Sequence, residues 1–222
     1  MSSNGTASKF DNALSLAKQI TFINKINNIF KRLLDIFLSL LAIILFSPLL
    51  ILIFLIIKKD GNGSALYIHT RVGKDFKEFQ CYKFRTMVLN ADPNRLAESA
   101  DDDRITAIGK ILRKTSLDEL PQIFNVLKGE MSIVGPRPAL PVQVKHFSEK
   151  EKLKLAVKPG ITGWTQVNGR NSIPYEKRME LDTWYAEHHN VALDIWIILK
   201  TFKVLLFPDK GIYDLNSSSP VE

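Results

Sequence analysis

The chain of 222 residues contains a single cysteine, Cys81. One cysteine cannot form an intramolecular disulfide, and it cannot supply a zinc site built from several cysteines. Such scarcity of cysteine is typical of proteins that fold in a reducing compartment. The composition therefore indicates that the soluble part of the chain lies in the cytoplasm.

Several common catalytic signatures are also missing. The chain has no Gly-x-x-x-x-Gly-Lys phosphate loop, no histidine and glutamate pair at zinc-site spacing, and no Gly-x-Ser-x-Gly turn. These absences disfavour the common nucleoside-triphosphate-binding and serine-hydrolase classes. The polar N-terminus, residues 1–11, lacks the order of a cleavable signal peptide, so we expect the apolar run that follows it to be retained.

What the chain does contain is positive charge and an uneven distribution of apolar residues. Its formal net charge of +7 predicts an anionic partner, which leaves nucleic acid, acidic lipid and a phosphorylated substrate open. Hydrophobic residues make up 45% of the chain, a globular average that hides their crowding between Leu33 and Ile57. The length predicts one compact catalytic unit with an anchor.

The run from Leu33 to Ile57 is long enough to cross a bilayer, because about 20 helical residues match a hydrocarbon core of roughly 30 Å. Ser47-Pro48 near its middle predicts a bend. Basic pairs flank both ends, Lys31-Arg32 and Lys58-Lys59, which favours a cytoplasmic position for both. The residues alone leave a kinked full span and a helix that enters one leaflet and returns equally open.

The segment before this run divides into two parts. Residues 1 to about 12 predict a disordered polar tail. Ala13 to Arg32 carries apolar residues at helical spacing with lysines between them, which predicts a basic amphipathic helix. This helix could lie on an anionic membrane surface or pack on the domain.

The remaining sequence predicts a small α+β domain. Two alternating stretches, Leu66–His69 and Phe79–Phe84, predict a β-hairpin. The polar stretch Asn90–Arg104 predicts an exposed loop, and its acidic run, residues 101–103, predicts a solvated turn rather than a metal site. Helices are expected at Ile105–Lys114, Leu117–Leu127, Tyr175–His188 and Ala192–Phe207, and a short strand at Met131–Val134.

Cations and carboxylates concentrate in one part of the chain, namely Lys83, Arg85, Arg113, Asp118, Glu119, Arg137 and Arg170. Phosphoryl transfer uses this mixture, because arginines and a carboxylate-held divalent ion stabilise phosphate charge and an aspartate can serve as nucleophile. On the residues alone an alternative stays open. Each arginine can be a surface residue, and Ser116 with Glu119 can form the capping box of a helix.

Four stretches carry a resemblance to a known family, namely Tyr82–Met87, Ser116–Ser132, Val134–Pro138 and Pro159–Trp164. From about Lys31 to Tyr213 the chain closely resembles the bacterial sugar transferases, the monotopic phosphoglycosyl transferases. The resemblance implies a tail and possible amphipathic helix at 1–30, a catalytic domain at 60–213 and a tail at 214–222. At 31–59 it implies a re-entrant membrane helix broken at Ser47-Pro48.

The resemblance also implies a reaction. A sugar 1-phosphate would move from a UDP-sugar to undecaprenyl (polyprenyl) phosphate, with release of UMP, through a covalent intermediate on Asp118. Asp118 would also hold Mg²⁺ in part, and Glu119 would position or deprotonate groups around it. Substrate contacts are expected from Lys83, Arg85, Arg113, Arg137, Arg170 and Asp194, with helix capping as an equal alternative for Asp194. Lys31 and Arg32 would lie near phospholipid headgroups.

Such an enzyme would initiate a membrane-associated glycan pathway at the bacterial inner (cytoplasmic) membrane, with its catalytic domain on the cytoplasmic face. We expect the small catalytic-core form, without the extra transmembrane helices of larger members, and Ala192–Phe207 could support a homodimer. A catalytically silent scaffold for glycan-assembly enzymes is the alternative, which the intact Asp118-Glu119 pair disfavours. No nucleic-acid partner is expected, because the cations match no helix-turn-helix or RNA-binding pattern.

Overall fold

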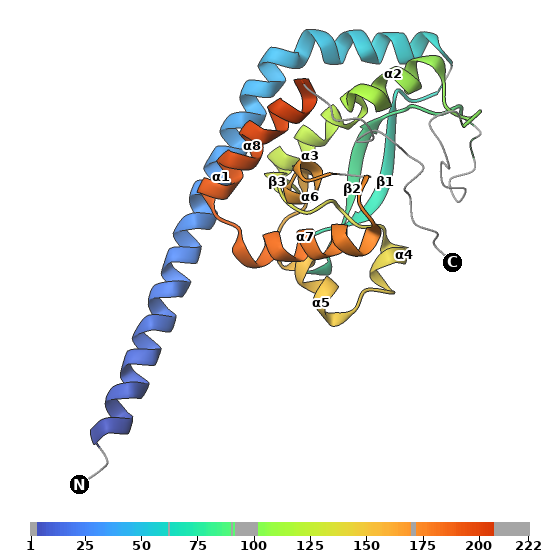
Figure 1. Cartoon of the computed structure of the whole chain (residues 1–222). Helices are drawn as coiled ribbons and strands as arrows, with labels where there is room; N and C mark the ends of the chain where they lie inside the picture. The colour runs from blue at the N-terminus through green and yellow to red at the C-terminus, as the bar shows by residue number, and fades with distance from the viewer. Residues whose placement is uncertain (1–3, 62, 90, 92–101, 170–171, 207–222) are drawn as a thin grey trace.

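The computed structural model describes residues 4–61, 63–89, 91, 102–169 and 172–206, with the backbone alone for residues 4–25 and 205–206. A long bent helix lies against a small domain of short helices and two small sheets (Figure 1). This arrangement agrees with the predicted α+β class.

Helix α1 runs from Asn4 to Lys59 and so includes most of the expected N-terminal tail. Pro48 lies inside the helix, and Figure 1 shows α1 turning sharply between its blue and cyan parts. A proline has no amide hydrogen to donate to the carbonyl oxygen four residues before it. Ser47 Oγ donates to that oxygen, on Ile44, at 3.0 Å. The serine therefore replaces the missing hydrogen bond at the predicted bend.

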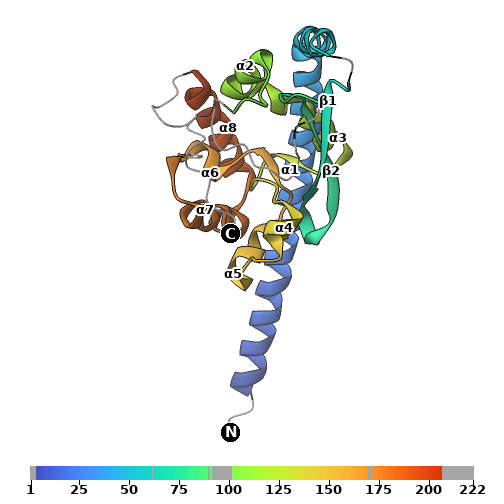
Figure 2. The same ribbon diagram turned by 90° about the vertical axis from the view of Figure 1, so that its right-hand side faces the viewer.

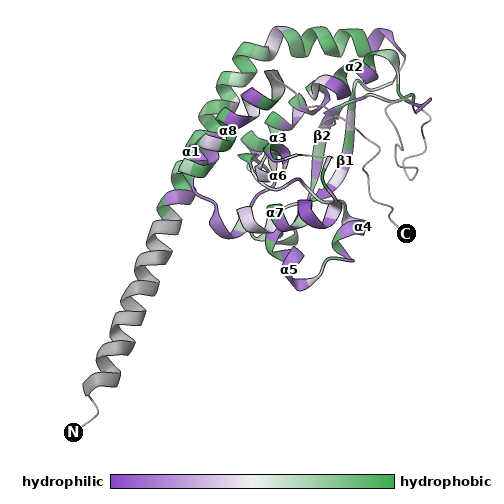
Figure 3. Cartoon of the chain, viewed as in Figure 1, coloured by the Kyte–Doolittle hydropathy of each residue, from purple (hydrophilic) through white to green (hydrophobic). Residues whose placement is uncertain are grey.

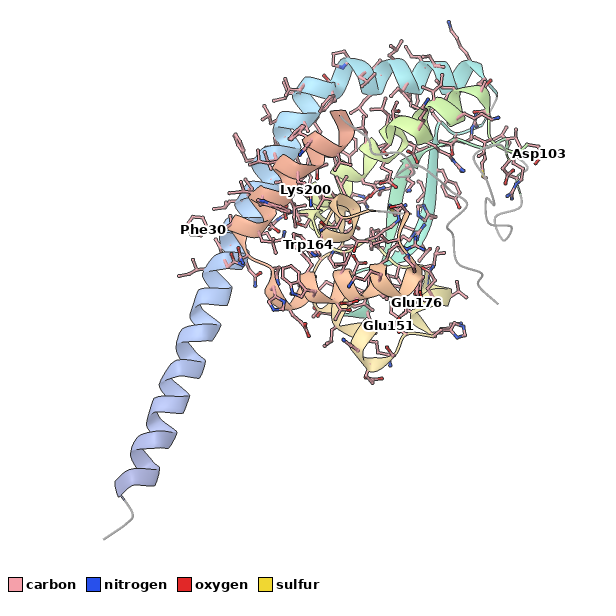
Figure 4. All side chains as sticks on the ribbon, viewed as in Figure 1. Phe30, Asp103, Glu151, Trp164, Glu176 and Lys200 are labelled. Carbon is pink, nitrogen blue, oxygen red and sulfur yellow. The ribbon has the colours of Figure 1, made fainter. Side chains whose placement is uncertain are left out.

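The stretch Ile26–Lys59 of α1 has the length and composition of a membrane span, and it is the one such helix in the described part of the chain. Only 11% of its most apolar window is buried, whereas a core helix of a soluble protein is mostly buried. Hydrophobic residues lie along α1 on both sides of the bend (Figure 3), and many of their side chains are exposed. Phe30, for example, projects outward from the helix (Figure 4). These features favour contact with lipid.

The first arm of α1, before Pro48, is attached to the domain by a buried ion pair. Lys31 Nζ donates to the Asp194 carboxylate at 2.7 Å and to the Val134 carbonyl oxygen at 2.8 Å. The Tyr185 hydroxyl also donates to Asp194, and burial followed by the Asp194 charge raises the pKa of Tyr185. The Lys31 and Asp194 side chains are only 11% and 1% exposed, so each buried charge needs the other as its counter-charge.

Arg32 and Asp35 extend this attachment. Arg32 donates to two carbonyl oxygens in the last turn of helix α3 (Ile123–Lys128), those of Val126 and Leu127, at 2.6 and 2.7 Å. Asp35 accepts from Ser132 Oγ at 2.9 Å. The headgroup role that we predicted for Lys31 and Arg32 does not fit, because both cations bind groups of the domain.

The second arm of α1, after Pro48, packs on the same domain through apolar contacts. Ile53 and Ile57 are buried in a cluster with Phe84 and Leu112. Arg85 Nη2 donates to the Ile57 carbonyl oxygen at 3.2 Å. Both arms of α1 therefore contact one and the same domain.

The domain contains two small sheets. Strands β1 (Leu66–Val72) and β2 (Glu78–Phe84) pair antiparallel, which confirms the predicted hairpin. Strands β3 (Ser132–Val134) and β4 (Gly160–Thr162) pair in parallel. The backbone segments next to these two strands approach closely, since a Cβ on Gly135 would lie 2.3 Å from the Lys158 carbonyl oxygen. Figure 2 shows the hairpin on one side of the domain and helices α6, α7 and α8 on the other.

The predicted helix at Leu117–Leu127 is two elements, a 3₁₀ helix η2 (Leu117–Gln122) followed by α3. Ser116 has left-handed backbone angles, φ 59° and ψ 17°, and its amide closes the end of α2 (Ala107–Thr115). Its side chain makes no capping bond to η2. The predicted capping box is therefore wrong, because a residue that ends one helix in this conformation does not present its hydroxyl to the next.

The acidic run was predicted to be a solvated turn, and the structure describes two of its residues, Asp102 and Asp103. Asp102 is buried and pairs with Arg104 at 2.6 Å, whereas the predicted solvated turn would leave it in water. Asp103 does lie at the surface (Figure 4). Residues 90 and 92–101 of the predicted loop lie outside the described residues.

The remaining elements complete the domain. Helix α7 has its predicted bounds and α8 nearly so, with Phe207 outside the described residues, and β3, α7 and α8 share a core that includes Val134, Tyr185 and Ile197. The remaining elements are α4 (Pro141–Val144), α5 (Glu149–Lys152), η3 (Leu153–Ala156), α6 (Trp164–Val167), α7 (Tyr175–His188) and α8 (Val191–Leu206).

The ion pair between α1 and α8 predicts a large effect of one substitution. Asp194→Ala leaves the Lys31 charge buried without its carboxylate, so we expect the free energy of unfolding in detergent to fall by about 3–5 kcal/mol. The control is Glu180→Ala, which removes an exposed pair with Lys177 and should cost less than about 1 kcal/mol. Equal losses in the two variants would contradict the structural role of Asp194.

Candidate active site

Glu119 joins three separate segments of the chain. Its Oε1 accepts from Lys83 Nζ of β2 at 2.7 Å and from Arg137 Nη2, in the turn after β3, at 3.1 Å. The Glu119 side chain is 12% exposed, so water contributes little to its solvation. Charge-assisted bonds to two cations fix this carboxylate in place.

Asp118 precedes Glu119 in η2 but has different surroundings. Its side chain is partly exposed and accepts no hydrogen bond from the residues that the structure describes. Burial raises the pKa of Asp118, the nearby Lys83 lowers it, and the Glu119 charge raises it again. Asp118 therefore keeps its carboxylate oxygens available to a ligand, beside cations that favour its ionised form.

Arg113, on α2, is a further cation near Asp118. Its Nε donates to Thr86 Oγ1 at 2.9 Å. Burial lowers the pKa of Arg113, and the Asp118 charge is the largest influence that opposes this. Gly109 permits the close approach of α2, because a Cβ there would lie 2.1 Å from the Thr86 carbonyl oxygen. Three of the predicted site cations, Lys83, Arg113 and Arg137, are thus gathered around Asp118.

A cleft lies beside these residues, and we call it the Glu119 cleft. It is lined by His69, Arg71, Cys81, Lys83, Glu119, Gln122, Arg137, Pro138 and Gly160. Burial, followed by the charge of Arg137, lowers the pKa of Arg71 to about 10. Such a concentration of cations favours an anionic ligand, and arginines bind phosphate oxygens particularly well.

Comparison with known proteins agrees with this chemistry. Residues 26–208 match the family model described as bacterial sugar transferase. The chain belongs to the bacterial sugar transferase family. It is 46% identical over 203 residues to an uncharacterised sugar transferase of Haemophilus influenzae, and the match covers 84% of this chain and 43% of that protein.

Two further relatives carry more informative names. The undecaprenyl-phosphate galactose phosphotransferase of Salmonella typhimurium is 45% identical over 199 residues, which cover 82% of this chain and 41% of that protein. The exopolysaccharide production protein ExoY of Sinorhizobium fredii is 37% identical over 217 residues, with coverages of 90% and 96%. This sugar transferase chain therefore spans less than half the length of the Haemophilus and Salmonella proteins.

Some residues expected in the site of this sugar transferase lie elsewhere. Arg85 bonds to α1, and Asp194 is held by Lys31, so neither joins the group around Asp118. Asp194 is not a helix cap either, because Asn190 Oδ1 accepts the Leu193 amide at the start of α8. Arg170 lies outside the described residues. The local sequence could not reveal the positions of Arg85 and Asp194, because each depends on a partner in α1.

The sequence analysis also missed His69 and Arg71, which line the Glu119 cleft. Hairpin register could have revealed them. Tyr67 pairs with Lys83 and His69 with Cys81, and alternate residues of a strand share a face. Burial, followed by the charges of Arg71 and Lys83, lowers the pKa of His69 to about 3. The imidazole in this sugar transferase is therefore neutral near pH 7.

The residues around Asp118 fit a magnesium ion. The described residues include no group of three or more histidine, cysteine, aspartate or glutamate side chains suited to a metal. Mg²⁺ needs fewer, because it binds one or two carboxylates and completes its shell with water and substrate phosphate. Asp118 meets this requirement through its available oxygens, whereas Glu119 already faces Lys83 and Arg137.

Proposed function

We propose that this bacterial sugar transferase moves a sugar 1-phosphate from a UDP-sugar to undecaprenyl phosphate and releases UMP. The observation that carries the proposal is the contrast between the two neighbouring carboxylates, Asp118 and Glu119. Glu119 is fixed by Lys83 and Arg137, while the carboxylate of Asp118 stays available beside the same cations. The name of the Salmonella relative, an undecaprenyl-phosphate galactose phosphotransferase, supports this choice of substrates.

In the first step an oxygen of Asp118 attacks the phosphorus that bears the sugar. A bond forms between this oxygen and phosphorus, the bond from phosphorus to the UMP oxygen breaks, and UMP leaves with the electron pair. Lys83 and Arg137 offset the negative charge that spreads over the phosphate oxygens. In the second step an oxygen of undecaprenyl phosphate attacks the same phosphorus, and the Asp118 carboxylate is released.

Glu119 acts in this scheme by holding the cations. Its bonds to Lys83 and Arg137 set the positions of both groups before substrate arrives, and such preorganisation avoids rearrangement during the reaction. Arg113, which is held by Thr86, adds a third cation near Asp118. A Mg²⁺ ion held by Asp118 would supply further charge neutralisation to the pyrophosphate of the donor.

We further propose that α1 enters one leaflet and returns, at the cytoplasmic face of the bacterial inner membrane. Support comes from its two arms. Lys31 before the bend and Ile57 after it both contact the catalytic domain, so both ends of the apolar stretch lie on the side of that domain. This position brings a lipid-linked phosphate and a soluble nucleotide sugar to one interface.

The first test measures UMP release by protein in nanodiscs, with Mg²⁺, undecaprenyl phosphate and a panel of UDP-sugars. The wild type should release UMP from at least one donor, and Asp118→Asn should lower the rate by about a thousandfold or more, because the nucleophile is lost. The control is Glu176→Gln, which changes an exposed side chain in α7 and should match the wild type. Folded wild type that releases no UMP from any donor would favour the scaffold alternative, and release of UDP would indicate transfer of the sugar alone.

The pH dependence tests the surroundings of Asp118. Since the carboxylate is the attacking form, the rate should fall as the pH drops through the Asp118 pKa, which lies above the ordinary value of about 3.9. Lys83→Met removes a charge that lowers this pKa, so the acid limb should move to higher pH. Lys145→Met removes an exposed charge on another element and should leave the limb in place. An unmoved limb in Lys83→Met would contradict the proposed coupling.

The position of α1 is tested by labelling single cysteines in a Cys81→Ser background. Asn28 precedes the apolar run Leu33–Ile57 and Asp60 follows it, and both are exposed. In inside-out membrane vesicles, a membrane-impermeant maleimide should label Asn28→Cys and Asp60→Cys alike. Labelling of the two positions from opposite faces would demonstrate a full span instead.

A further inference from the structure

The Glu119 cleft contains a histidine to which the proposed mechanism gives no role. Both ring nitrogens of His69 are shielded from water, and neither has a hydrogen-bond partner among the described residues. Arg71 Nε, on the same wall of the cleft, is likewise unpartnered. Buried polar atoms are nearly always hydrogen-bonded, since leaving them unpaired is unfavourable. These atoms therefore point to a polar ligand that binds at the β1 wall of the cleft.

The position of His69 is fixed by the hairpin. Tyr67 and His69 are alternate residues of β1, and their rings stack with centroids 5.1 Å apart and an interplanar angle of 16°. Tyr67 lies opposite Lys83 in the ladder, so His69 shares a sheet face with Lys83. The imidazole is thus a rigid group within the same cleft as Lys83, Glu119 and Arg137.

The chemistry of the imidazole narrows the choice of ligand. Arg71, Lys83 and Arg137 surround it with positive charge, Glu119 is the acidic group that faces it, and the ring is neutral. A neutral imidazole offers one donor and one acceptor. A phosphate oxygen accepts only, and the neighbouring cations serve it better. A hydroxyl both donates and accepts, and the part of a UDP-sugar that carries hydroxyls next to the reacting phosphate is the transferred sugar.

We propose that His69 hydrogen-bonds a hydroxyl of the transferred sugar and thereby helps to select the donor. This inference rests on the proposed function, because it places the sugar phosphate beside Asp118. A site built to pair with a hydroxyl discriminates against a sugar that lacks it or presents it in another direction, because the protein group then stays unpaired. His69 would therefore determine which UDP-sugar reacts, while Lys83 and Arg137 bind the phosphates common to all donors.

The experiment compares kcat/KM for UMP release from UDP-glucose, UDP-galactose, UDP-N-acetylglucosamine and UDP-N-acetylgalactosamine. His69→Phe keeps an aromatic ring against Tyr67 and removes both nitrogens. We expect it to reduce the preference for the best donor over the others by about tenfold or more. His69→Gln retains a donor and an acceptor and should recover part of the preference. If His69→Phe does not fold, His69→Leu provides the same comparison.

The control is Thr70→Val. Thr70 is on the opposite face of β1, where its Oγ1 accepts from the exposed Gln80 at 3.3 Å, and the variant should keep the wild-type preference. An equal loss for all four donors in His69→Phe would overturn the proposal and indicate a purely structural role. A break between pH 5 and 8 in the wild-type profile that disappears in His69→Phe would also overturn it, because the ring would then exchange a proton. Wild type that releases no UMP would refute the proposed function itself.

Discussion

The contact of Glu119 with Lys83 and Arg137 is the interaction on which the candidate site depends. It joins the hairpin, η2 and the turn after β3, three segments that are distant in the sequence. A carboxylate that is mostly withdrawn from water is unfavourable without counter-charges, so Glu119 depends on the cations that the other two segments supply. Once they are joined, Asp118 lies among cations with its own oxygens available. One ion-pair network thus joins three segments and places cations beside Asp118.

The attachment of α1 gives this site its location. Polar groups hold the first arm, through Lys31 and Asp194, and apolar groups hold the second, through Ile53 and Ile57. Between Ile26 and Ile56, many other apolar side chains of the helix are exposed, and lipid can cover them. Because the bend at Pro48 lets both arms reach one domain, the helix can anchor the protein without placing its two ends on opposite sides. In the proposed function this geometry holds the active site at the surface where its lipid substrate is found.

In the proposed function, the Glu119 cleft would separate general from selective recognition of the donor. Its charged groups would suit any UDP-sugar, since every such donor has the same two phosphates. The neutral His69, which is held by Tyr67 in a surrounding of cations, differs from them in offering both a donor and an acceptor. The strongly basic character of the site therefore promotes binding of the class of substrate, and a single uncharged group can distinguish members of that class.

The sequence by itself determined the features that follow from local patterns. Alternation along residues 66–84 specified the hairpin, the stretch 175–188 indicated the helix α7, and the apolar run with Ser47-Pro48 specified a bent helix. The dyad Asp118-Glu119 and its cations were also evident. Local periodicity and backbone preferences are properties of neighbouring residues, so they survive without knowledge of the fold.

Only the tertiary structure decided where the charges act. Lys31 and Arg32 have the same sequence pattern whether they face lipid or the domain, and their partners lie about a hundred residues or more away. Asp194 and Arg85 were misplaced for the same reason, and the left-handed Ser116 ended a helix instead of beginning one. The position of His69 on the same sheet face as Lys83 follows from the pairing of two strands. Long-range pairing depends on the whole packed chain, because a buried charge or polar group takes whichever partner the fold brings to it.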